Sequence, residues 1–339
     1  MVISIKDVAK RAGVSAGTVS NVFSGNRAVK SDLVERVRRA ATDLGYQPDR
    51  AASQLRAGKA RIVAALVPDL NNPFFTSLIA SIEARVRGEG YDIIVASSHG
   101  DAEEETRRLA ALLGWRPAGV VIIPCNDDFS SRELLMGSGI PFVVADRVPS
   151  YFEGDAVTVD NVDAGRQAAE HLVALGHARF VVAASSMKLQ NIRERCEGIA
   201  AVLAKQGLPS PTLIEVGLDF DTASERLGTF MEGEQQATAF IALTNFATLG
   251  ILASAHKTGL SVPDDISVMG FDDYSWMHAV KPPLTAIRQP VEEIGRTIWN
   301  RLRGHLDDEG EPPARERLLC ELVVRASTGA PKTAGVSSA

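Results

Sequence analysis

Cysteines are few in this chain of 339 residues, and long apolar runs are missing. The three cysteines, Cys125, Cys196 and Cys320, are odd in number and far apart, which argues against a disulfide framework or a cysteine metal site. We expect them to be small buried hydrophobic residues. No segment reaches the roughly 18 apolar residues that a membrane span needs. The charged opening MVISIKDVAK has no apolar signal-peptide core, so we expect a cytoplasmic protein.

Groups for catalysis are also missing. The six histidines are scattered without metal-ligand spacing, and no phosphate loop of the G-x-x-x-x-G-K-[ST] type occurs. The stretch GVSAG, residues 13–17, matches the nucleophile elbow of hydrolases, but that motif needs a strand before Ser15, where an amphipathic helix is expected instead. A nucleotide-dependent α/β enzyme would lack both its phosphate motif and its catalytic groups. We predict no enzyme activity, no cofactor and no metal site.

The charges are distributed unevenly along the chain. Residues 1–60 contain eleven Lys and Arg and five Asp and Glu, a net charge of +6, whereas residues 61–339 carry −12. A basic start on an acidic remainder indicates a polyanionic partner for the start alone. The alternative is an ordinary solvated helix surface.

Three short amphipathic helices are expected in the basic start. Ser4, Ser15 and Ser31 are predicted N-caps, and Gly13 and Gly45 are predicted to end the first and third helices. Their apolar stripes are Ile5, Val8, Ala9 and Ala12; Val19, Val22 and Phe23; and Leu33, Val34, Val37, Ala40, Ala41 and Leu44. Two short helices joined by a glycine turn are typical of a helix-turn-helix.

The second helix is unusual on its outward side, which is small and polar. An ordinary surface helix would carry Lys, Glu or Arg there, and Gly17 costs roughly 1 kcal/mol against alanine in a helix interior. Small side chains let a helix enter the major groove of DNA. Thr18 and the free amides at the helix start can meet phosphates, whereas Asn21 and the Ala16 methyl can address base edges. The predicted contacts in the head are Ser15, Ala16, Gly17, Thr18 and Asn21. A purely structural helical hairpin is the alternative.

The motif IKDVAKRAGVSAGTVSNVFSG resembles the DNA-binding head of the LacI/GalR family of bacterial transcription repressors, and LGYQPDRAASQLRAGKAR resembles that family's hinge. The likeness extends from residue 3 to about residue 327. It implies that Ala16, Gly17 and Asn21 occupy the main base-reading positions. Family members often carry larger side chains at the first two and arginine at the third, so the operator sequence cannot be carried over.

Residues 50–57, RAASQLRA, form a segment too short to be a stable helix alone. The resemblance implies paired hinge helices that form on DNA, with Leu55 wedged between base steps of the minor groove. It also implies that Arg50 and Arg56 meet the groove or the backbone. A plain linker that happens to contain a leucine is the alternative.

From residue 61 onward, short apolar runs such as RIVAALVPD, GVVIIPCN and DISVMGFDD alternate with amphipathic helical segments. This alternation predicts buried parallel strands in doubly wound α/β sheets. The predicted fold is a small all-α helix-turn-helix head plus an α/β core of two doubly wound subdomains, which the resemblance likens to periplasmic binding proteins. The expected divisions are the head at 1–48, the hinge at 49–60, one subdomain at 61–160 plus 291–318, the other at 161–290 plus 319–328, and a disordered tail at 329–339.

Polar and aromatic residues at the predicted strand ends suit a polyhydroxylated ligand, because ligands of open α/β sheets bind there and each hydroxyl needs a partner. Several of these polar residues could instead cap the following helices. The motifs NPFF, NIRERCEG and GFDD match effector-contact motifs of the family. Where the family usually has Asn-Asp, this chain has Thr244 and Asn245, so a sugar, a nucleoside and a sugar acid all stay open. The predicted effector residues are Phe74, Phe75, Asp146, Asn191, Arg195, Phe220, Asn245, Asp272 and Trp276.

These features together predict a DNA-binding repressor. A homodimer would place two heads on a roughly palindromic operator, and a small sugar-like metabolite between the core subdomains would change operator affinity. The tail TGAPKTAGVSSA has no apolar heptads, which argues against a tetramer-forming coiled coil. The alternative, a sugar-transport receptor, would leave residues 1–58 without a purpose.

Overall fold

The computed structural model describes the chain except residues 1–2, 25–28, 47–60, 234–235, 308–311 and 333–339. The chain divides into a small unit, chiefly residues 1–61, and a large unit that holds two β-sheets. We call these the head and the core and describe each by itself. The predicted hinge contacts Arg50, Leu55 and Arg56 lie outside the described residues.

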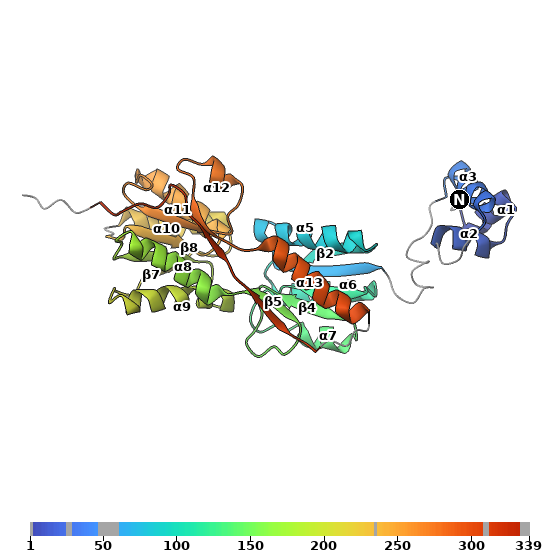
Figure 1. The fold of residues 1–339 in the computed structure, drawn as a ribbon, viewed down its shortest axis with the longest axis horizontal. Coiled ribbons are helices and arrows are strands. Elements are labelled where there is room, and N and C mark those ends of the chain that lie inside the picture. Colours follow the sequence, from blue (N-terminus) through green and yellow to red (C-terminus); the bar gives the residue numbers. More distant parts are fainter. Residues whose placement is uncertain (1–2, 25–28, 47–60, 234–235, 308–311, 333–339) are drawn as a thin grey trace, which may run out of the picture. The chain divides into compact units, whose positions relative to one another are not determined.

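The head consists of three helices, α1 (Ile5–Ala12), α2 (Ala16–Ser24) and α3 (Ser31–Leu44) (Figure 1). The Asp7 carboxylate accepts hydrogen bonds from the Ser4 amide at 2.9 Å and the Ser4 hydroxyl at 2.7 Å, which ties down the start of α1. The Ser15 hydroxyl accepts a hydrogen bond from the Thr18 amide at 3.1 Å, as predicted for an N-cap. The predicted cap Ser31 is wrong, because Ser31 is already the first residue of α3 and follows Lys30.

The apolar stripes of the three helices meet in one small core. Its buried residues are Val8, Ala9, Ala12, Val19, Val37, Ala40 and Ala41. Phe23 was expected on this apolar face but is 37% exposed, and its ring lies 6.0 Å from that of Tyr46. It therefore covers the edge of the head core.

The first half of the core is built on a six-stranded parallel sheet with the order β11-β5-β4-β3-β1-β2. Alternate strand residues pack on opposite faces, one under α5 and α13 and the other under α6 and α7. The strands are β1 (Ile62–Val67), β2 (Asp92–Ser97), β3 (Gly119–Ile122), β4 (Phe142–Ala145), β5 (Ala156–Val159) and β11 (Arg315–Leu318). The helices are α5 (Pro73–Gly88), α6 (Ala102–Gly114), α7 (Arg132–Gly137) and α13 (Val291–Leu306).

The second half of the core repeats this plan with the order β12-β10-β9-β8-β6-β7, in which β12 is antiparallel to β10. Helices α8 and α9 cover one face and α10 and α11 the other. The strands are β6 (Phe180–Ala184), β7 (Thr212–Glu215), β8 (Ala239–Ala242), β9 (Ser267–Phe271), β10 (Thr285–Arg288) and β12 (Glu321–Val323). The helices are α8 (Asn161–Ala174), α9 (Gln190–Lys205), α10 (Phe220–Glu232), α11 (Asn245–Thr258) and α12 (Trp276–Ala279).

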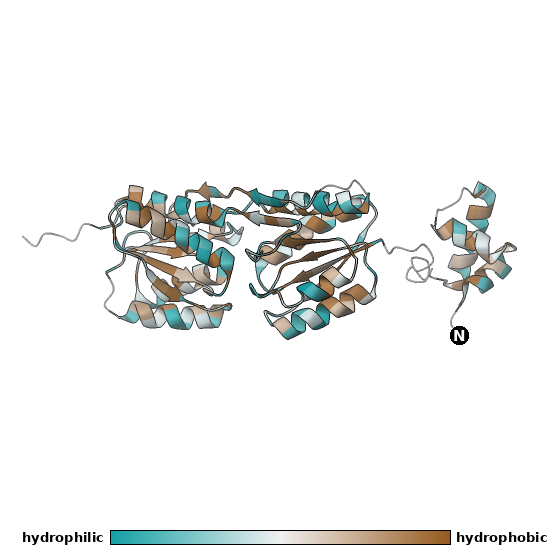
Figure 2. Ribbon diagram, turned by 90° about the horizontal axis from the view of Figure 1, so that it is seen from below, coloured by the Kyte–Doolittle hydropathy of each residue, from teal (hydrophilic) through white to brown (hydrophobic). Residues whose placement is uncertain are grey.

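The two sheets match strand for strand, so β1 to β5 correspond to β6 to β10. The chain passes between the halves after β5, after β10 and after β11. In both sheets the strands are apolar and the helices turn their polar residues outward (Figure 2). This confirms the predicted fold class of a helical head and two doubly wound subdomains.

Helices α8 and α9 approach each other so closely that glycine is required at the contact. A Cβ added to Gly165 of α8 would lie 2.0 Å from the Arg195 carbonyl oxygen of α9. A Cβ on Gly198 of α9 would lie 2.0 Å from the Val162 carbonyl oxygen of α8. This contact holds α8 against α9, which carries the predicted effector residues Asn191 and Arg195.

The tail predicted as disordered from residue 329 begins too early. Gly329 donates its amide to the Ser267 hydroxyl at 2.9 Å, and its carbonyl oxygen lies 2.9 Å from His177 Nε2. Lys332 forms an ion pair with Asp265 at 2.6 Å. Small polar composition suggested disorder, but the buried Ser267 and His177 hold Gly329, and Lys332 is held by its ion pair with Asp265 at the surface.

Candidate DNA-binding surface and effector site

Helix α2 presents a small, polar surface on the head. Ser15 and Gly17 are exposed, and a Cβ at Gly17 would meet only the Ser15 hydroxyl oxygen, at 3.6 Å. The side chain of Asn21, one helical turn beyond Gly17, makes no hydrogen bond with any described residue. Its donors and acceptors are therefore free for a base edge.

Two of the predicted contacts also have roles inside the head. The Thr18 hydroxyl lies 2.9 Å from the Ser15 hydroxyl and belongs to the capping arrangement of α2. Ala16 packs partly against the apolar core of the head. Their small size serves this packing as well as a close approach to DNA.

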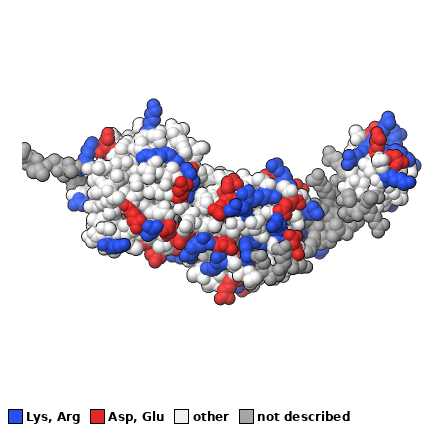
Figure 3. Space-filling model, viewed as in Figure 1, with Lys and Arg blue, Asp and Glu red and all other residues white. Residues whose placement is uncertain are grey.

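Basic side chains surround the end of α1 and the middle of α3. Arg36 donates a hydrogen bond to the Ala12 carbonyl oxygen at 2.6 Å, and Arg11 lies 3.7 Å from Asp43. Lys10 and Arg39 line the same hollow. Figure 3 shows Lys and Arg on the head with a few acidic residues among them. This distribution is consistent with the positive net charge of residues 1–60.

In the core, Asp146 and Asp272 occupy equivalent positions of the two halves. Asp146 directly follows β4 and Asp272 directly follows β9, which is the matching strand. Both have left-handed backbones, with φ of 58° and 78°. A residue other than glycine rarely adopts this conformation, and such strain is concentrated at functional sites. The fold therefore turns one carboxylate from each half toward the same region.

Arg195 of α9 is the central cation of this region. It is 3% exposed and donates hydrogen bonds to Asn161 Oδ1 at 2.9 Å and to the Leu243 carbonyl oxygen at 2.7 Å. Its guanidinium lies 3.7 Å from the centroid of the Phe271 ring. These contacts fix the orientation of the Arg195 side chain.

Burial raises the pKa of the Asp146 carboxyl above its usual value, although Arg147 and Arg195 favour its charged form. Burial also raises the pKa of Asp272, which Arg195 and hydrogen bonds from Gln289 and Tyr274 partly offset. The Asp272 carboxylate accepts the Gln289 amide at 2.5 Å and the Tyr274 hydroxyl at 2.8 Å. Burial thus disfavours the charged form of both carboxyls, and hydrogen-bond donors of a ligand would favour that form.

The structure brings four of the nine predicted effector residues together, namely Asp146, Asn191, Arg195 and Asp272. The Asn191 amide donates to Asp146 at 3.4 Å, and the Trp276 indole donates to Asn245 at 3.3 Å. Asn191 and Asn245 are both buried, at the first turns of α9 and α11. No hydrogen bond links the Trp276–Asn245 pair to Arg195 among the described residues.

The three phenylalanines are placed differently. Phe74 and Phe75 are 5% and 2% exposed and belong to the large hydrophobic core, with Arg147 lying 5.4 Å above the Phe75 ring. Phe220 is 41% exposed at the start of α10 and has no described contact with the acidic pair. A ligand contact by these side chains stays a prediction.

Sequence reasoning missed three residues that belong to this region. Asn161 and Gln289 contact Arg195 and Asp272 directly. Asn161 is the residue after Asp160, and Gln289 follows the end of β10, so both lie at strand ends, where the same rule applies. The third is Asp127 of the first half, whose carboxylate lies 2.5 Å from Arg193 of α9 and accepts the Gln190 amide at 3.1 Å. Nothing in the sequence pattern pairs Asp127 with α9.

The comparisons agree with this architecture. Residues 4–49 match the model of the bacterial regulatory proteins of the lacI family, and residues 169–328 match that of a periplasmic binding protein-like domain. The HTH-type transcriptional regulator DegA of Bacillus subtilis (strain 168) is 28% identical over 97% of this chain and 98% of its own.

Two solved structures are similar over most of this chain. The lac repressor dimer bound to operator and the anti-inducer ONPF is 26% identical, with a TM-score of 0.85, and covers 97% of this chain and 100% of that one. A LacI family transcriptional regulator from Enterococcus faecium with bound ribose is 27% identical, with a TM-score of 0.70, over 80% of this chain and 100% of that one.

A helix-turn-helix head with a two-half α/β core defines a DNA-binding regulator with an effector domain. The chain belongs to the LacI family of transcriptional regulators, and its effector domain is periplasmic-binding-protein-like. LacI-family regulators are not enzymes, so the predicted lack of enzyme activity is confirmed. Among the described residues, none of the helices has both the length and the apolar character for crossing a membrane.

Proposed function

We propose that this regulator is a repressor whose operator affinity is controlled by a sugar or sugar derivative bound between the two halves of the core. The observation that carries this proposal is the set of Asp146, Arg195 and Asp272. One carboxylate comes from each half, and the buried arginine lies near both. Paired donors and acceptors of this kind suit neighbouring hydroxyl groups. The relative from Enterococcus faecium was solved with ribose, which favours the same ligand class.

Ligand hydroxyls would donate hydrogen bonds to the two carboxylates. Their donation compensates the buried negative charge and favours the ionised form of Asp146 and Asp272. Because the two carboxylates belong to different halves, a ligand that engages both stabilises one relative arrangement of the halves.

The head supplies recognition of the operator. Asn21 reads a base edge, Ala16 and Gly17 permit a close approach, and Ser15 and Thr18 meet the backbone. The hinge residues Arg50, Leu55 and Arg56 would complete the contacts in the minor groove. A homodimer acting in the cytoplasm would place two heads on a pseudo-palindromic operator. The similar lac repressor structure is a dimer bound to operator, which supports this arrangement. The arrangement of the core halves then favours or disfavours the hinge, which couples effector and operator reciprocally.

The experiment compares the full chain with residues 61–339 alone. Operator sites are first selected from a random duplex library with the full chain. We expect the full chain to retard the selected duplex and the truncated chain not to, while both are stabilised by the same ligand in a thermal-shift screen of sugars, polyols, sugar acids and nucleosides. A ligand at about 100 times its Kd adds roughly 2.7 kcal/mol of stability.

Release of the duplex by that ligand tests the coupling. A ligand that binds but leaves operator affinity unchanged would contradict the proposed control. Retardation of the duplex by the truncated chain would place the DNA contacts in the core instead of the head.

A further inference from the structure

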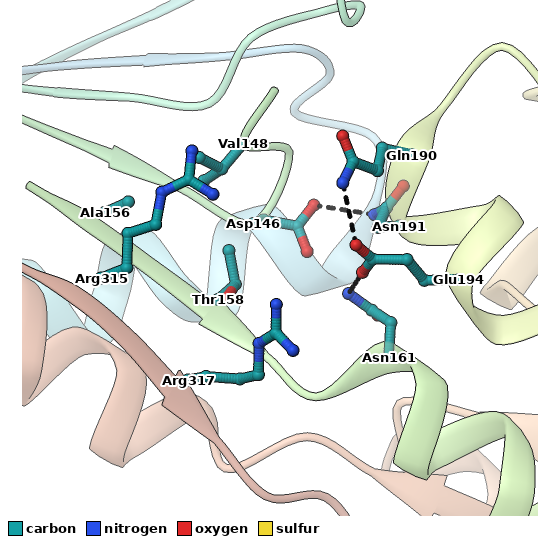
Figure 4. Close-up of a pocket in the computed structure, with 10 residues that line it drawn as sticks. All are labelled: Asp146, Val148, Ala156, Thr158, Asn161, Gln190, Asn191, Glu194, Arg315 and Arg317. Atoms are coloured by element: carbon teal, nitrogen blue, oxygen red, sulfur yellow. Dashed lines mark hydrogen bonds between the residues drawn. The ribbon is translucent and has the colours of Figure 1, made fainter. Parts of the chain in front are cut away.

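A polar pocket of about 230 Å³ lies beside the predicted effector residues and shares only Asp146 and Asn191 with them (Figure 4). We infer that this pocket is a second ligand site, for a small anion that carries hydroxyl groups, such as a hydroxy acid. The inference goes beyond the proposed function because it assigns a second ligand to a pocket most of whose lining residues lie outside the predicted effector set. The other lining residues are Val148, Ala156, Thr158, Asn161, Gln190, Glu194, Arg315 and Arg317.

Two arginines of β11 supply positive charge to the pocket. Arg315 and Arg317 lie two residues apart on one strand, so their side chains leave the same face of the sheet, and both point into the pocket (Figure 4). Arg315 donates to the carbonyl oxygens of Pro149 at 2.9 Å and Ser150 at 3.3 Å, which holds its guanidinium in place. Arg317 forms no hydrogen bond or ion pair with any described residue. Its donors are free for a ligand.

Two helices begin at the same pocket. Asn161 is the first residue of α8 and Gln190 the first of α9, and both line the cavity. Each helix N-terminus carries a partial positive charge and therefore favours an anion. Both helix starts already have a carboxylate near them, because Asp160 accepts the Asp163 backbone amide of α8 at 2.9 Å and Asp127 accepts the Gln190 backbone amide of α9 at 3.1 Å. The guanidinium of Arg317, which has no partner among the described residues, is therefore the main support for an anionic group in the ligand.

Acceptors on the opposite wall account for the hydroxyl groups. The Glu194 carboxylate accepts hydrogen bonds from the side-chain amide of Gln190 at 2.9 Å and from that of Asn161 at 3.2 Å. It forms no ion pair with a described residue. Among the residues that line the pocket, only Asn191 donates a hydrogen bond to the Asp146 carboxylate. A carboxylate has more acceptor sites than one or two amides fill, so each can still accept from a hydroxyl. The ligand thus has an acidic end at Arg317 and hydroxyls toward Glu194 and Asp146.

The size and position of the pocket define the ligand further. A volume of about 230 Å³ is below the roughly 300–1,000 Å³ of sites for drug-sized ligands, so a small metabolite fits better. The strands β5 and β11 belong to the first half of the core, whereas α9 belongs to the second half. An anion held between Arg317 and α9 would therefore stabilise the present arrangement of the halves.

The test uses the full chain and a pair of probes with one carbon skeleton, gluconate and sorbitol, which differ in the carboxylate. Inorganic phosphate is the third probe. Affinities are measured by calorimetry for the wild type, for Arg317→Gln, and for Arg296→Gln, an exposed arginine on α13 that serves as the charge-matched control. We expect gluconate to bind at least about tenfold more tightly than sorbitol, and Arg317→Gln to lose at least about tenfold in gluconate affinity, because a hydrogen bond between charged groups is removed. Arg296→Gln should bind as the wild type does.

The outcomes separate this site from the proposed effector site. Arg195→Lys serves as the effector-site variant, and gluconate binding that depends on Arg195 but not on Arg317 would overturn the second site. Equal binding of sorbitol and gluconate would overturn the anionic ligand. Binding of phosphate without gluconate would overturn the hydroxyl contacts, and no binding of any probe would overturn the pocket as an anion site. None of these measurements uses DNA, so a failure of the repressor proposal leaves them interpretable.

Discussion

The contact between Asp127 and Arg193 gives a direct test of how the two halves of the core are held together. Asp127 lies in the loop after β3 of the first half, and Arg193 lies on α9 of the second half. Their side chains approach to 2.5 Å, and the Asp127 carboxylate also accepts a hydrogen bond from the backbone amide of Gln190 at 3.1 Å. We expect Asp127→Asn to weaken this arrangement and to lower effector affinity.

The magnitude follows from the exposure of the pair. The side chain of Arg193 is 44% exposed and that of Asp127 is 25% exposed, so the ion pair contributes about 0.2–1 kcal/mol. The asparagine still accepts the Gln190 amide through Oδ1 and loses only the charge assistance of that bond. A total loss of about 1 kcal/mol corresponds to roughly a fivefold weaker effector affinity. Because partly exposed charges are screened, the difference should shrink as salt is raised.

The assay is calorimetry with an effector found by the thermal-shift screen. The variants are Asp127→Asn, Arg193→Gln, the double variant, and Asp128→Asn, which removes the same charge one residue away without breaking a described ion pair. The double variant should lose less than the sum of the two single losses. Additive losses of effector affinity, or an Asp128→Asn loss as large as that of Asp127→Asn, would refute the idea that this ion pair holds the two halves together.

Three further changes test the head, the packing and the titration of the core. Asn21→Ala should cost about 1–3 kcal/mol on the selected operator and relax one base position; equal weakening on all duplexes in a binding assay would assign Asn21 to the backbone. Gly198→Ala should destabilise the core by about 1–3 kcal/mol through overpacking against α8, whereas Gly304→Ala, which meets nothing within 4 Å, should not; urea unfolding measures both. Asp272→Asn should stabilise the free protein at neutral pH. The folded-state pKa of Asp272 is raised, so the stability that this carboxyl contributes is fully present below the ordinary pKa of 3.8 and is lost as pH rises through the folded-state pKa. A gain in thermal stability of Asp272→Asn over the wild type that does not grow with pH would contradict this.

The architecture could be predicted from sequence because local patterns determine it. The apolar stripes of the head and the apolar runs of the core each specify one buried surface, and the alternation of the two specifies the layers. Strand-end logic likewise found Asp146 and Asp272. It could not separate Phe220, which the fold leaves exposed, from Phe74 and Phe75, which the fold buries. Burial of an aromatic residue next to a strand end depends on which helices cover it, and no local pattern records that.

Contacts between the halves were beyond sequence reasoning for the same reason. Asp127 and Arg193 are 66 residues apart, and each is an ordinary charged residue in its own segment. The pocket lined by Arg317 combines a strand near the end of the chain with two helix starts from its middle. Only the path of the chain, which returns to the first half after β10, brings these residues together.

The duplication of the core explains why ligand binding and arrangement of the halves should be linked. Each half ends its equivalent strand in an aspartate with a left-handed backbone, and Arg195, which lies near both aspartates, comes from the second half. Burial raises the pKa of Asp146, and Arg147 of its own half and then Arg195 of the other half partly offset this, so Asp146 depends on the other half for part of its compensation. Separating the halves would leave Asp146 with Arg147 and remove the contribution of Arg195. A ligand whose hydroxyls reach both Asp146 and Asp272 compensates both carboxylates only when the halves stay close. Its binding free energy therefore favours that arrangement of the halves. By reciprocity, any second molecule that binds better to this arrangement binds more tightly when the ligand is present.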